Sequence, residues 1–225
     1  MLPFAIGGDL TNLIADMKKT KRGEKAKVFE EKQLLFWMIQ LIEGLAYLHK
    51  QKIVHRDMKE LNILLDEDSN VKICDFGLAN QFKTDDETLT NKCGTPGYWA
   101  PEQIKAEPYQ YMPDWWALGV ILYKLMVRRA PFEPEGAEWT VNPEWIKDKK
   151  SPGWKEPEEL TAFKKNKNAE QDRRIKEEKP HPWNSNPKNR NVEKDYSESI
   201  RDLCLKLLTV EQKDRIGYTG DGEEI

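Results

Sequence analysis

Four polar residues in the first third of the chain could together catalyse phosphoryl transfer. Asp57, Lys59 and Asn62 lie within the run HRDMKELN at residues 55–62, and Asp75 follows within ICDFGLA. In such a site an aspartate accepts or orients the proton of the attacking hydroxyl, and a lysine offsets the developing negative charge. Amide and carboxylate oxygens are suited to Mg²⁺. The set therefore predicts a metal-assisted phosphoryl-transfer site.

A third motif follows these two along the chain. Residues 93–102 read CGTPGYWAPE, at a spacing compatible with the other two. Together the three motifs resemble the catalytic loop, the metal-binding Asp-Phe-Gly and the end of the activation segment of eukaryotic protein kinases. The resemblance implies an enzyme that uses ATP and Mg²⁺ and phosphorylates protein substrates.

The resemblance also assigns roles to individual residues. Asp57 is the proton acceptor, Lys59 the cation at the transferring phosphate, and Asn62 and Asp75 the magnesium ligands, with Asp75 the principal one. Tyrosine kinases usually lack a lysine at the position of Lys59, and Thr95 matches the threonine that serine/threonine kinases place beside the base. We therefore expect serine and threonine as acceptors.

Composition disfavours several other classes of protein. Lys and Arg number 36 against 39 Asp and Glu, a net charge of −3, so no nucleic-acid partner is expected. No apolar stretch reaches the roughly 18 residues of a membrane span, and no signal-like segment opens the sequence. We expect a soluble, cytoplasmic protein. Cys74, Cys93 and Cys204 have neither disulfide-framework nor zinc-site spacing.

Two long helices are expected to support the site. Apolar side chains recur at helical spacing within residues 28–49 and predict a core helix, while residues 113–126 are almost wholly apolar and predict a helix buried on all sides. Short β-prone pieces at 53–54, 63–65 and 71–73 predict small strands around the catalytic loop. The predicted fold class is mainly α, a protein-kinase-like large lobe with a few short strands.

Residues 133–196 break this pattern and are interpreted as a charged insert. The stretch 164–179 has 11 charged residues among its 16, which is typical of a solvated helix or a disordered run. Four tryptophans indicate that parts of the insert pack against the lobe or a protein partner. They are Trp139, Trp145, Trp154 and Trp183. A further helix is predicted at 199–208, and Gly217 suits a helix C-terminus.

Regulatory roles are implied next to the catalytic loop. His55 and Phe76 are expected to be packed rather than reactive, and in the resemblance both join a hydrophobic spine. Arg56 is expected to pair with a phosphorylated residue of the activation segment. Relatives with Cys-Gly-Thr usually carry that residue two positions before the cysteine, where this chain has Asn91. The hypothesis for the phosphorylation site is therefore Thr90.

Three charged residues are implied to be structural. Asp114 lies in the first turn of the buried helix and braces the catalytic loop from below in the resemblance. Glu102 and Arg215 match a buried ion pair that ties the end of the activation segment to the last helices. Loss of the arginine would leave a buried carboxylate unpaired.

The first ten residues resemble the hinge between the two kinase lobes. Pro3 and Ala5 match positions whose backbone holds the adenine ring, Asp9 matches the acidic residue that binds the ribose, and Leu64 matches the side chain beneath the adenine. A Gly-Gly-Asp at a helix start is also common as a simple cap, so the local pattern alone leaves both interpretations open.

The motifs also indicate a group within the family. Residues 114–119 and 93–96 resemble the cyclic-nucleotide-dependent and receptor-directed kinases, and Gly-Thr-Pro-Gly-Tyr also fits the calmodulin-dependent group. The former group often uses two glutamates to select basic residues before the acceptor. This chain has Leu61 and Lys124 at those positions.

Two functions are compatible with the sequence. The glycine-rich loop and the Val-Ala-Ile-Lys-type lysine precede the hinge in the family, so residues 1–225 are interpreted as a partial kinase domain that begins at the hinge and is inactive alone. It is either part of an active serine/threonine kinase or a catalytically incomplete lobe that acts as a protein-binding module through residues 133–196. The intact catalytic set favours the kinase, and Ala-Pro-Glu at 100–102 argues against a small-molecule kinase.

Overall fold

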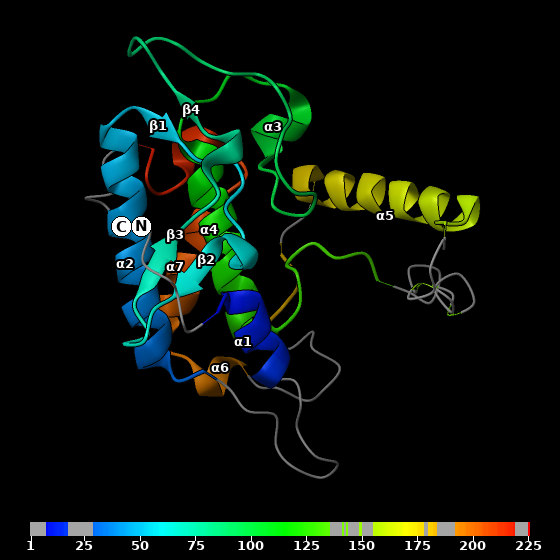
Figure 1. The fold of residues 1–225 in the computed structure, drawn as a ribbon, viewed down its shortest axis with the longest axis horizontal. Helices are drawn as coiled ribbons and strands as arrows, with labels where there is room; N and C mark the ends of the chain where they lie inside the picture. Colours follow the sequence, from blue (N-terminus) through cyan, green and yellow to red (C-terminus); the bar gives the residue numbers. More distant parts are fainter. Residues whose placement is uncertain are drawn as a thin grey trace.

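The fold is mainly helical, with short strands beside the catalytic loop (Figure 1). A computed structural model describes residues 8–17, 29–135, 141, 143, 149, 155–177, 180–183, 192–218 and 225. The helices are α1 (Leu10–Met17), α2 (Glu31–Lys50), α3 (Pro101–Lys105), α4 (Met112–Val127), α5 (Glu158–Glu177), α6 (Val192–Asp195) and α7 (Glu198–Leu207). The strands are β1 (Ile53–Val54), β2 (Ile63–Leu65), β3 (Val71–Ile73) and β4 (Asn80–Gln81).

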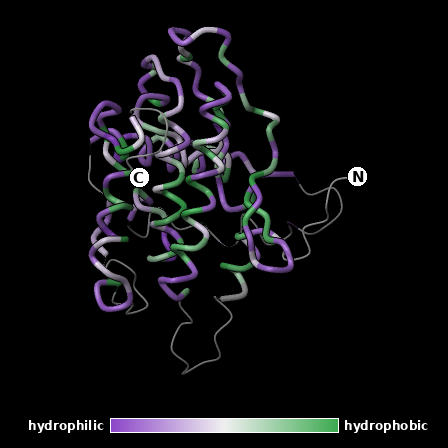
Figure 2. Tube along the Cα trace, turned by 90° about the vertical axis from the view of Figure 1, so that its left-hand side faces the viewer, coloured by the Kyte–Doolittle hydropathy of each residue, from purple (hydrophilic) through white to green (hydrophobic). Residues whose placement is uncertain are grey.

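Helix α4 is the centre of the core. Every one of its residues except Lys124 is buried, as its almost continuous apolar sequence predicts. Helices α2 and α7 pack against it, and hydrophobic residues gather in the middle of the described fold (Figure 2). Gly119 allows α7 to come close, since a Cβ there would lie 2.8 Å from Leu207 Cβ. The predicted buried helix is confirmed.

Helix α2 confirms the predicted core helix of residues 28–49, with a shift of a few residues at its start. Its buried face is made of Leu34, Met38, Leu41 and Leu45, together with Trp37 and His49. The mid-helix Gly44 has a packing reason, because a Cβ there would lie 3.2 Å from Ile73 Cδ1 in β3. The helix therefore lies directly against the strands that carry the site.

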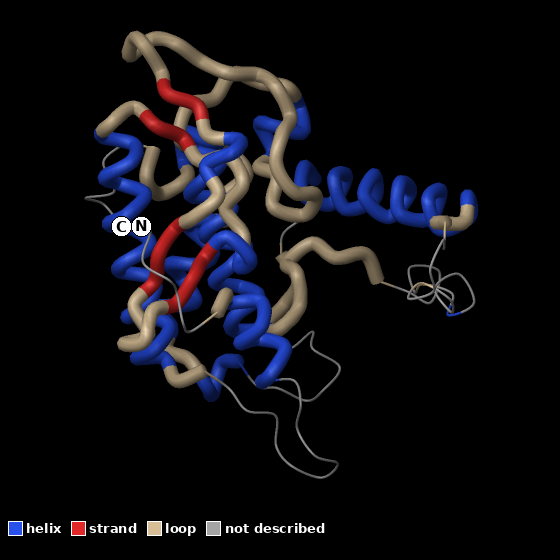
Figure 3. The backbone as a smooth tube through the Cα atoms, viewed as in Figure 1, coloured by secondary structure: helices blue, strands red, loops and turns tan. Residues whose placement is uncertain are grey.

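Two small antiparallel sheets hold the chain on either side of the candidate residues (Figure 3). In one sheet Ile63 pairs with Ile73 and Leu65 with Val71, and in the other Val54 pairs with Asn80. The catalytic loop runs from the end of β1 to the start of β2, and the Asp-Phe-Gly run lies between β3 and β4. The strands expected to flank the catalytic loop are confirmed.

The charged insert forms one long helix where the structure describes it. Helix α5 covers most of the stretch predicted to be a solvated helix or disordered, and only Leu160 and Ile175 are buried on it. It extends away from the body of the fold and meets α3 at one end (Figure 1). Trp183 stacks on Tyr123 with a ring separation of 5.3 Å, whereas the three other tryptophans of the insert lie outside the described residues.

The chain after α7 differs from the prediction at Gly217. Helix α7 ends at Leu207, and Gly217 follows a 3-10 turn rather than ending a helix. Its φ is +91°, and a Cβ would lie 2.7 Å from Trp115 Cδ1. Glycine is needed there for a close approach to the tryptophan and a left-handed backbone. Within the described part of the chain, no helix combines the length and apolar character that crossing a membrane requires.

Candidate active site

Asp114 fixes the start of the catalytic loop to α4. Its carboxylate accepts hydrogen bonds from the backbone N–H of His55 and of Arg56, both at 2.8 Å, and lies 2.9 Å from His49 Nε2. Arg56 has φ +66°, a left-handed conformation that costs about 1–2 kcal/mol for a residue with a side chain. The two bonds to Asp114 hold this bend immediately before Asp57.

The environment of Asp114 favours its ionised form. Burial alone would raise the pKa of this carboxyl, but the hydrogen bond from His49, the electrostatic influence of His49 and His55, and the hydrogen bond from the His55 N–H hold its pKa below the usual value. A buried carboxylate with three hydrogen bonds is a rigid support for the loop.

Asp57 lies at the centre of a cluster with Lys59 and Thr95. Thr95 Oγ1 donates to Asp57 Oδ1 at 2.6 Å, and Lys59 Nζ donates to Asp57 Oδ2 at 2.6 Å and to Thr95 Oγ1 at 2.9 Å. Asp57 is 8% exposed, so one edge of the cluster reaches solvent. The structure thus brings together three residues that the sequence places in two separate motifs.

Gly94 makes this approach possible. Its φ is +92°, and a Cβ would lie 2.4 Å from the carbonyl oxygen of Arg56 and 3.5 Å from Asp57 Oδ1. Any larger residue would push Thr95 away from the catalytic loop. In the sequence this glycine is recognisable only as part of the third motif.

The two candidate metal ligands lie at neighbouring strand ends. Asn62 Nδ2 donates to the carbonyl oxygen of Asp57 at 2.9 Å and to Asp57 Oδ2 at 3.2 Å, and among the described residues none donates to Asn62 Oδ1. The N–H of Cys74 donates to the carbonyl oxygen of Asn62 at 3.0 Å, which holds the residue before Asp75 against Asn62. The Asp75 carboxylate is exposed and accepts one hydrogen bond, from the Gly77 N–H at 3.3 Å. An oriented amide oxygen and an exposed carboxylate fit a hard cation such as Mg²⁺.

His55 and Phe76 form an edge-to-face pair, with ring centroids 5.0 Å apart. His55 is fully buried, and its Nε2 lies 3.0 Å from the carbonyl oxygen of Cys74. Phe76 differs from the expectation of a packed residue, because it is 46% exposed. About half of the side chain is therefore left uncovered by the described residues.

Arg56 contacts the activation segment at Asn91, not at Thr90. Its Nε donates to the carbonyl oxygen of Leu78 at 2.7 Å and its Nη1 to Asn91 Oδ1 at 3.3 Å. The backbone of Asn91 is held by Tyr109, whose hydroxyl donates to its carbonyl oxygen at 2.7 Å. Thr90 is exposed. The hypothesis of phosphorylation at Thr90 stays a prediction.

Glu102 and Arg215 form an ion pair through two hydrogen bonds inside the fold. Arg215 Nη1 donates to Glu102 Oε1 at 2.7 Å and Nη2 donates to Oε2 at 2.9 Å, and both side chains are 0% exposed. The pair joins the start of α3 to the chain that follows α7. It is the arrangement that the resemblance implied for these residues.

The N-terminal candidates are described only in part. Pro3 and Ala5 lie outside the described residues. Asp9 caps α1, because its Oδ1 accepts the Asn12 N–H at 2.9 Å, and it forms a β-bridge with Leu64. The bridge places this segment beside β2, the strand that follows the catalytic loop. The nucleotide contacts of Asp9 and Leu64 stay predictions.

Comparisons with known proteins agree with this geometry. The family model of the protein kinase domain matches residues 1–220. This chain belongs to the protein kinase family.

Three similar kinases illustrate the match. The chain is 42% identical over 123 residues to the eye isozyme of protein kinase C from Drosophila melanogaster. This match covers 55% of the chain and 17% of that protein. It is 43% identical over 108 residues to RAC-beta serine/threonine-protein kinase B from Xenopus laevis, and the match covers 48% of the chain and 22% of that protein. It is 38% identical over 130 residues to rhodopsin kinase GRK1 from Rattus norvegicus, and the match covers 58% of the chain and 22% of that protein. The matched segments therefore span about a fifth of the length of these relatives.

The kinase domain contains a second charged cluster that the sequence did not reveal. Lys124 Nζ lies 2.8 Å from Glu60 Oε1, and the Tyr98 hydroxyl donates to Glu60 Oε2 and accepts from Lys124. Burial, and then the charge of Glu60 and the hydrogen bond to it, raises the pKa of Tyr98 far above its usual range. Lys124 is the single cation in an apolar helix, a signal that a buried carboxylate must lie nearby. The exposed Leu61 takes no part in this cluster.

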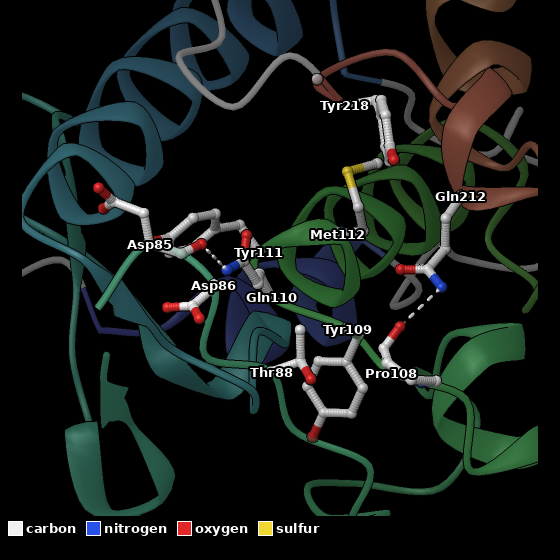
Figure 4. Close-up of a pocket in the computed structure, with 11 residues that line it drawn as sticks. Asp85, Asp86, Thr88, Pro108, Tyr109, Gln110, Tyr111, Met112, Gln212 and Tyr218 are labelled. Carbon is white, nitrogen blue, oxygen red and sulfur yellow. Dashed lines mark hydrogen bonds between the residues drawn. The ribbon is translucent and has the colours of Figure 1, made fainter. Parts of the chain in front are cut away.

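A hollow lies between the activation segment, the start of α4 and the chain after α7 (Figure 4). It has a volume of about 420 Å³ and is lined by Asp85, Thr88, Tyr111, Gln212 and Tyr218, among others. None of the candidate catalytic or metal-binding residues of this kinase domain lines it. One of its lining residues, Gln110, helps to hold the activation segment in place, because its Nε2 donates to the backbone carbonyl oxygens of Asp85 and Glu87.

Proposed function

We propose that this kinase domain transfers the γ-phosphate of ATP to serine and threonine hydroxyls of protein substrates. The observation that carries the proposal is the hydrogen bonding of Asp57. One of its carboxylate oxygens accepts a hydrogen bond from Thr95 Oγ1, and the other accepts one from Lys59 Nζ. This is the constellation of base, cation and acceptor-side threonine expected of a serine/threonine kinase. Relatives named serine/threonine-protein kinases support the same assignment.

In the proposed reaction Asp57 orients the acceptor hydroxyl and takes its proton as the oxygen attacks the terminal phosphorus of ATP. Carboxylates are weak bases at neutral pH, so positioning is the larger part of this role. The two short bonds to Thr95 and Lys59 support it, because they leave the carboxylate a single orientation. Lys59 can meanwhile offset negative charge on the transferring phosphate.

Asn62 and Asp75 are the proposed ligands of Mg²⁺. When bound, the metal ion neutralises charge on the nucleotide phosphates. The chain contributes the positioning: both Asn62 Nδ2 contacts go to Asp57, so the base and the amide oxygen are oriented together. Asp75 has φ +63°, a left-handed conformation that presents its carboxylate at the surface.

The proposed domain organisation follows the same resemblance. Residues 1–225 form the larger lobe of a kinase domain, starting at the hinge, with residues 133–196 as an insert available to a protein partner. Pro3, Ala5, Asp9 and Leu64 are the proposed nucleotide contacts on the hinge side. The bridge between Asp9 and Leu64 supports their grouping.

Regulation through Thr90 is also proposed. Its exposed side chain is accessible to a modifying enzyme, and its neighbour Asn91 already contacts Arg56. A phosphate at Thr90 would add negative charge beside that arginine. Mass spectrometry of active protein isolated from cells checks this, and an unmodified Thr90 would rule it out.

A phosphotransfer assay tests the proposed function. The 225-residue chain and a polypeptide extended upstream in its natural reading frame are incubated with radiolabelled ATP, Mg²⁺ and a protein substrate. We expect transfer by the extended form, and loss of at least about a hundredfold in rate with Asp57→Asn. Asp68→Asn, an exposed aspartate in the turn between β2 and β3, is the matched control and should be unaffected.

The same assay decides between the two functions. Phosphate transfer that Asp57→Asn abolishes supports the kinase. Transfer by neither form, with both folded and with nucleotide and Mg²⁺ in excess, would refute catalysis and favour a protein-binding module.

A further inference from the structure

The middle of the activation segment is fastened to the loop between α3 and α4. Leu89 forms a β-bridge with Tyr109, through two backbone hydrogen bonds of 2.8 and 2.9 Å. Gln110 Nε2 donates to the backbone carbonyl oxygens of Asp85 and Glu87, at 2.7 and 2.8 Å, and Figure 4 shows the bond to Asp85. These bonds join backbone and amide groups, so this path of the segment is held by neutral contacts.

Asn91 is the point where the activation segment meets the catalytic loop. Arg56 Nη1 donates to Asn91 Oδ1 at 3.3 Å, and Arg56 Nε donates to the carbonyl oxygen of Leu78 at 2.7 Å. The Tyr109 hydroxyl donates to the carbonyl oxygen of Asn91 at 2.7 Å, and Tyr109 is 2% exposed. A buried tyrosine therefore holds the backbone of Asn91 while its side chain presents an oxygen to Arg56.

Asn91 is connected to the proposed base along two routes. Arg56 directly precedes Asp57, and its backbone N–H donates to Asp114 at 2.8 Å. Thr95, four residues after Asn91, donates to Asp57 Oδ1 at 2.6 Å. A displacement of Asn91 would therefore reach Asp57 through the arginine on one side and the threonine on the other.

The chemistry of asparagine differs from that of a residue that is switched by phosphorylation. Kinase activation segments are often ordered when an arginine pairs with a newly phosphorylated residue. Asn91 has no hydroxyl to receive a phosphate, but its amide oxygen is a permanent hydrogen-bond acceptor. The guanidinium of Arg56 donates to that oxygen directly. Such a bond is weaker than one to a phosphate, but it needs no modifying enzyme.

We propose that Asn91 is a positioning residue that holds the activation segment against Arg56 without phosphorylation. The proposal rests on the proposed phosphotransfer function and concerns the regulation of the same site. A phosphate at Thr90 would add to this contact, whereas the contact itself does not require one.

Hydrogen exchange tests this role without catalysis. The upstream-extended polypeptide is treated with a phosphatase, mass spectrometry confirms that Thr90 carries no phosphate, and exchange is followed in peptides that cover residues 83–95. We expect Asn91→Ala to exchange about threefold faster there, because one modest hydrogen bond is lost. Asn91→Asp keeps an acceptor oxygen and should exchange no faster than the parent. The Tyr109 hydroxyl can bond to the backbone in each variant, so the comparison isolates the Arg56 contact.

Two further variants show whether the effect depends on the arginine. In an Arg56→Ala background, Asn91→Ala should cause little additional exchange, because the partner of the amide oxygen is already gone. Thr90→Ala is the matched control, since Thr90 is an exposed neighbour, and it should leave exchange unchanged. Asn91 is also exposed, so its variants should fold, which melting curves check.

Phosphotransfer by the same phosphatase-treated proteins tests the link to catalysis. We expect Asn91→Ala to be about threefold slower than the parent, and Asn91→Asp to transfer at least as fast as the parent. In an active kinase, a rate of Asn91→Ala equal to that of the parent would overturn the positioning role.

The exchange results separate this role from the proposed function. Unchanged exchange in Asn91→Ala, an equal increase in Thr90→Ala, or the same increase with and without Arg56 would overturn the role even if phosphate is transferred. Faster exchange that Asn91→Asp reverses and that depends on Arg56 supports it. That support would stand even if no polypeptide transferred phosphate, a result that would overturn the kinase function alone.

Discussion

Replacing Arg215 by methionine is expected to destabilise the fold by about 3–5 kcal/mol, the usual effect of breaking a buried ion pair. Arg215 donates to both oxygens of Glu102, at 2.7 and 2.9 Å, and neither side chain is exposed. Methionine fills much of the same space but leaves the Glu102 carboxylate buried without a counter-ion. The unpaired charge accounts for most of the expected loss in the free energy of unfolding.

Three backbone acceptors lose their donor in the same substitution. Arg215 also donates to the carbonyl oxygens of Met112, Thr209 and Val210, at 3.0, 2.8 and 3.1 Å. These bonds join the start of α4 to the chain after α7. Their loss favours the upper end of the range of about 3–5 kcal/mol, because a buried acceptor left without a donor is itself destabilising.

Thermal unfolding measures the effect. For a domain of 150–250 residues each kcal/mol shifts Tm by about 2–4 °C, so Arg215→Met should lower Tm by roughly 6–20 °C. Arg173→Met is the matched control, because Arg173 pairs with Glu170 and Glu177 at the surface and is 44% exposed. Its effect should stay within about 1 kcal/mol.

A double variant distinguishes unpaired charge from lost packing. Glu102→Gln combined with Arg215→Met removes the buried carboxylate charge, so the double variant should unfold at a higher temperature than Arg215→Met alone. An Arg215→Met protein with the same Tm as Arg173→Met, or a double variant in which the two single losses simply add, would exclude the unpaired charge as the cause.

Three further substitutions have defined outcomes. Gly94→Ala places a Cβ 2.4 Å from the Arg56 carbonyl oxygen at φ +92°, so melting should show a loss of about 1–3 kcal/mol, and an unchanged Tm would contradict this. Gly119→Ala places a methyl group 2.8 Å from Leu207 Cβ, so urea unfolding should show a loss of about 1–3 kcal/mol, and an unchanged midpoint would argue against close packing there. Asp114 has a pKa below its ordinary 3.8, so its ionised form stabilises the fold above that pH and this contribution is lost as pH falls through the lowered pKa. Asp114→Asn should therefore be less stable than the parent in urea at neutral pH, and the difference should shrink in acid; a constant difference would exclude the ionised carboxylate as its cause.

The sequence predicted those features of the fold and of the candidate site that depend on residues close together in the chain. Helices α2 and α4 follow from the spacing and density of apolar residues, and the strands beside the catalytic loop follow from short β-prone pieces between turn residues. The candidates Asp57 and Asn62 come from one motif, and the structure places them in direct hydrogen-bond contact. Short sequence separation made this geometry predictable.

Contacts between distant segments could not be predicted in the same way. Asn91 reaches Arg56 because Tyr109, 18 residues later, holds its carbonyl oxygen. Trp115 and Gly217 are about a hundred residues apart in the sequence, so the local pattern around Gly217 suggested only a helix end. The exposure of Phe76 likewise depends on what covers its ring, which its apolar character does not determine.

The two charged residues of α4 explain how one buried helix positions the whole catalytic loop. Asp114 and Lys124 are the only charged residues in α4, and each contacts the loop: Asp114 at the backbone of Arg56 and Lys124 at the carboxylate of Glu60. They are ten residues apart, about 15 Å along a helix at 1.5 Å per residue. The buried Asp114 accepts hydrogen bonds from the backbone of the loop and the partly buried Lys124 pairs with Glu60, so Asp57 lies between two fixed points. A shift of α4 by one turn would therefore move both ends of the loop, which ties the geometry of the base to the packing of α4 in the core.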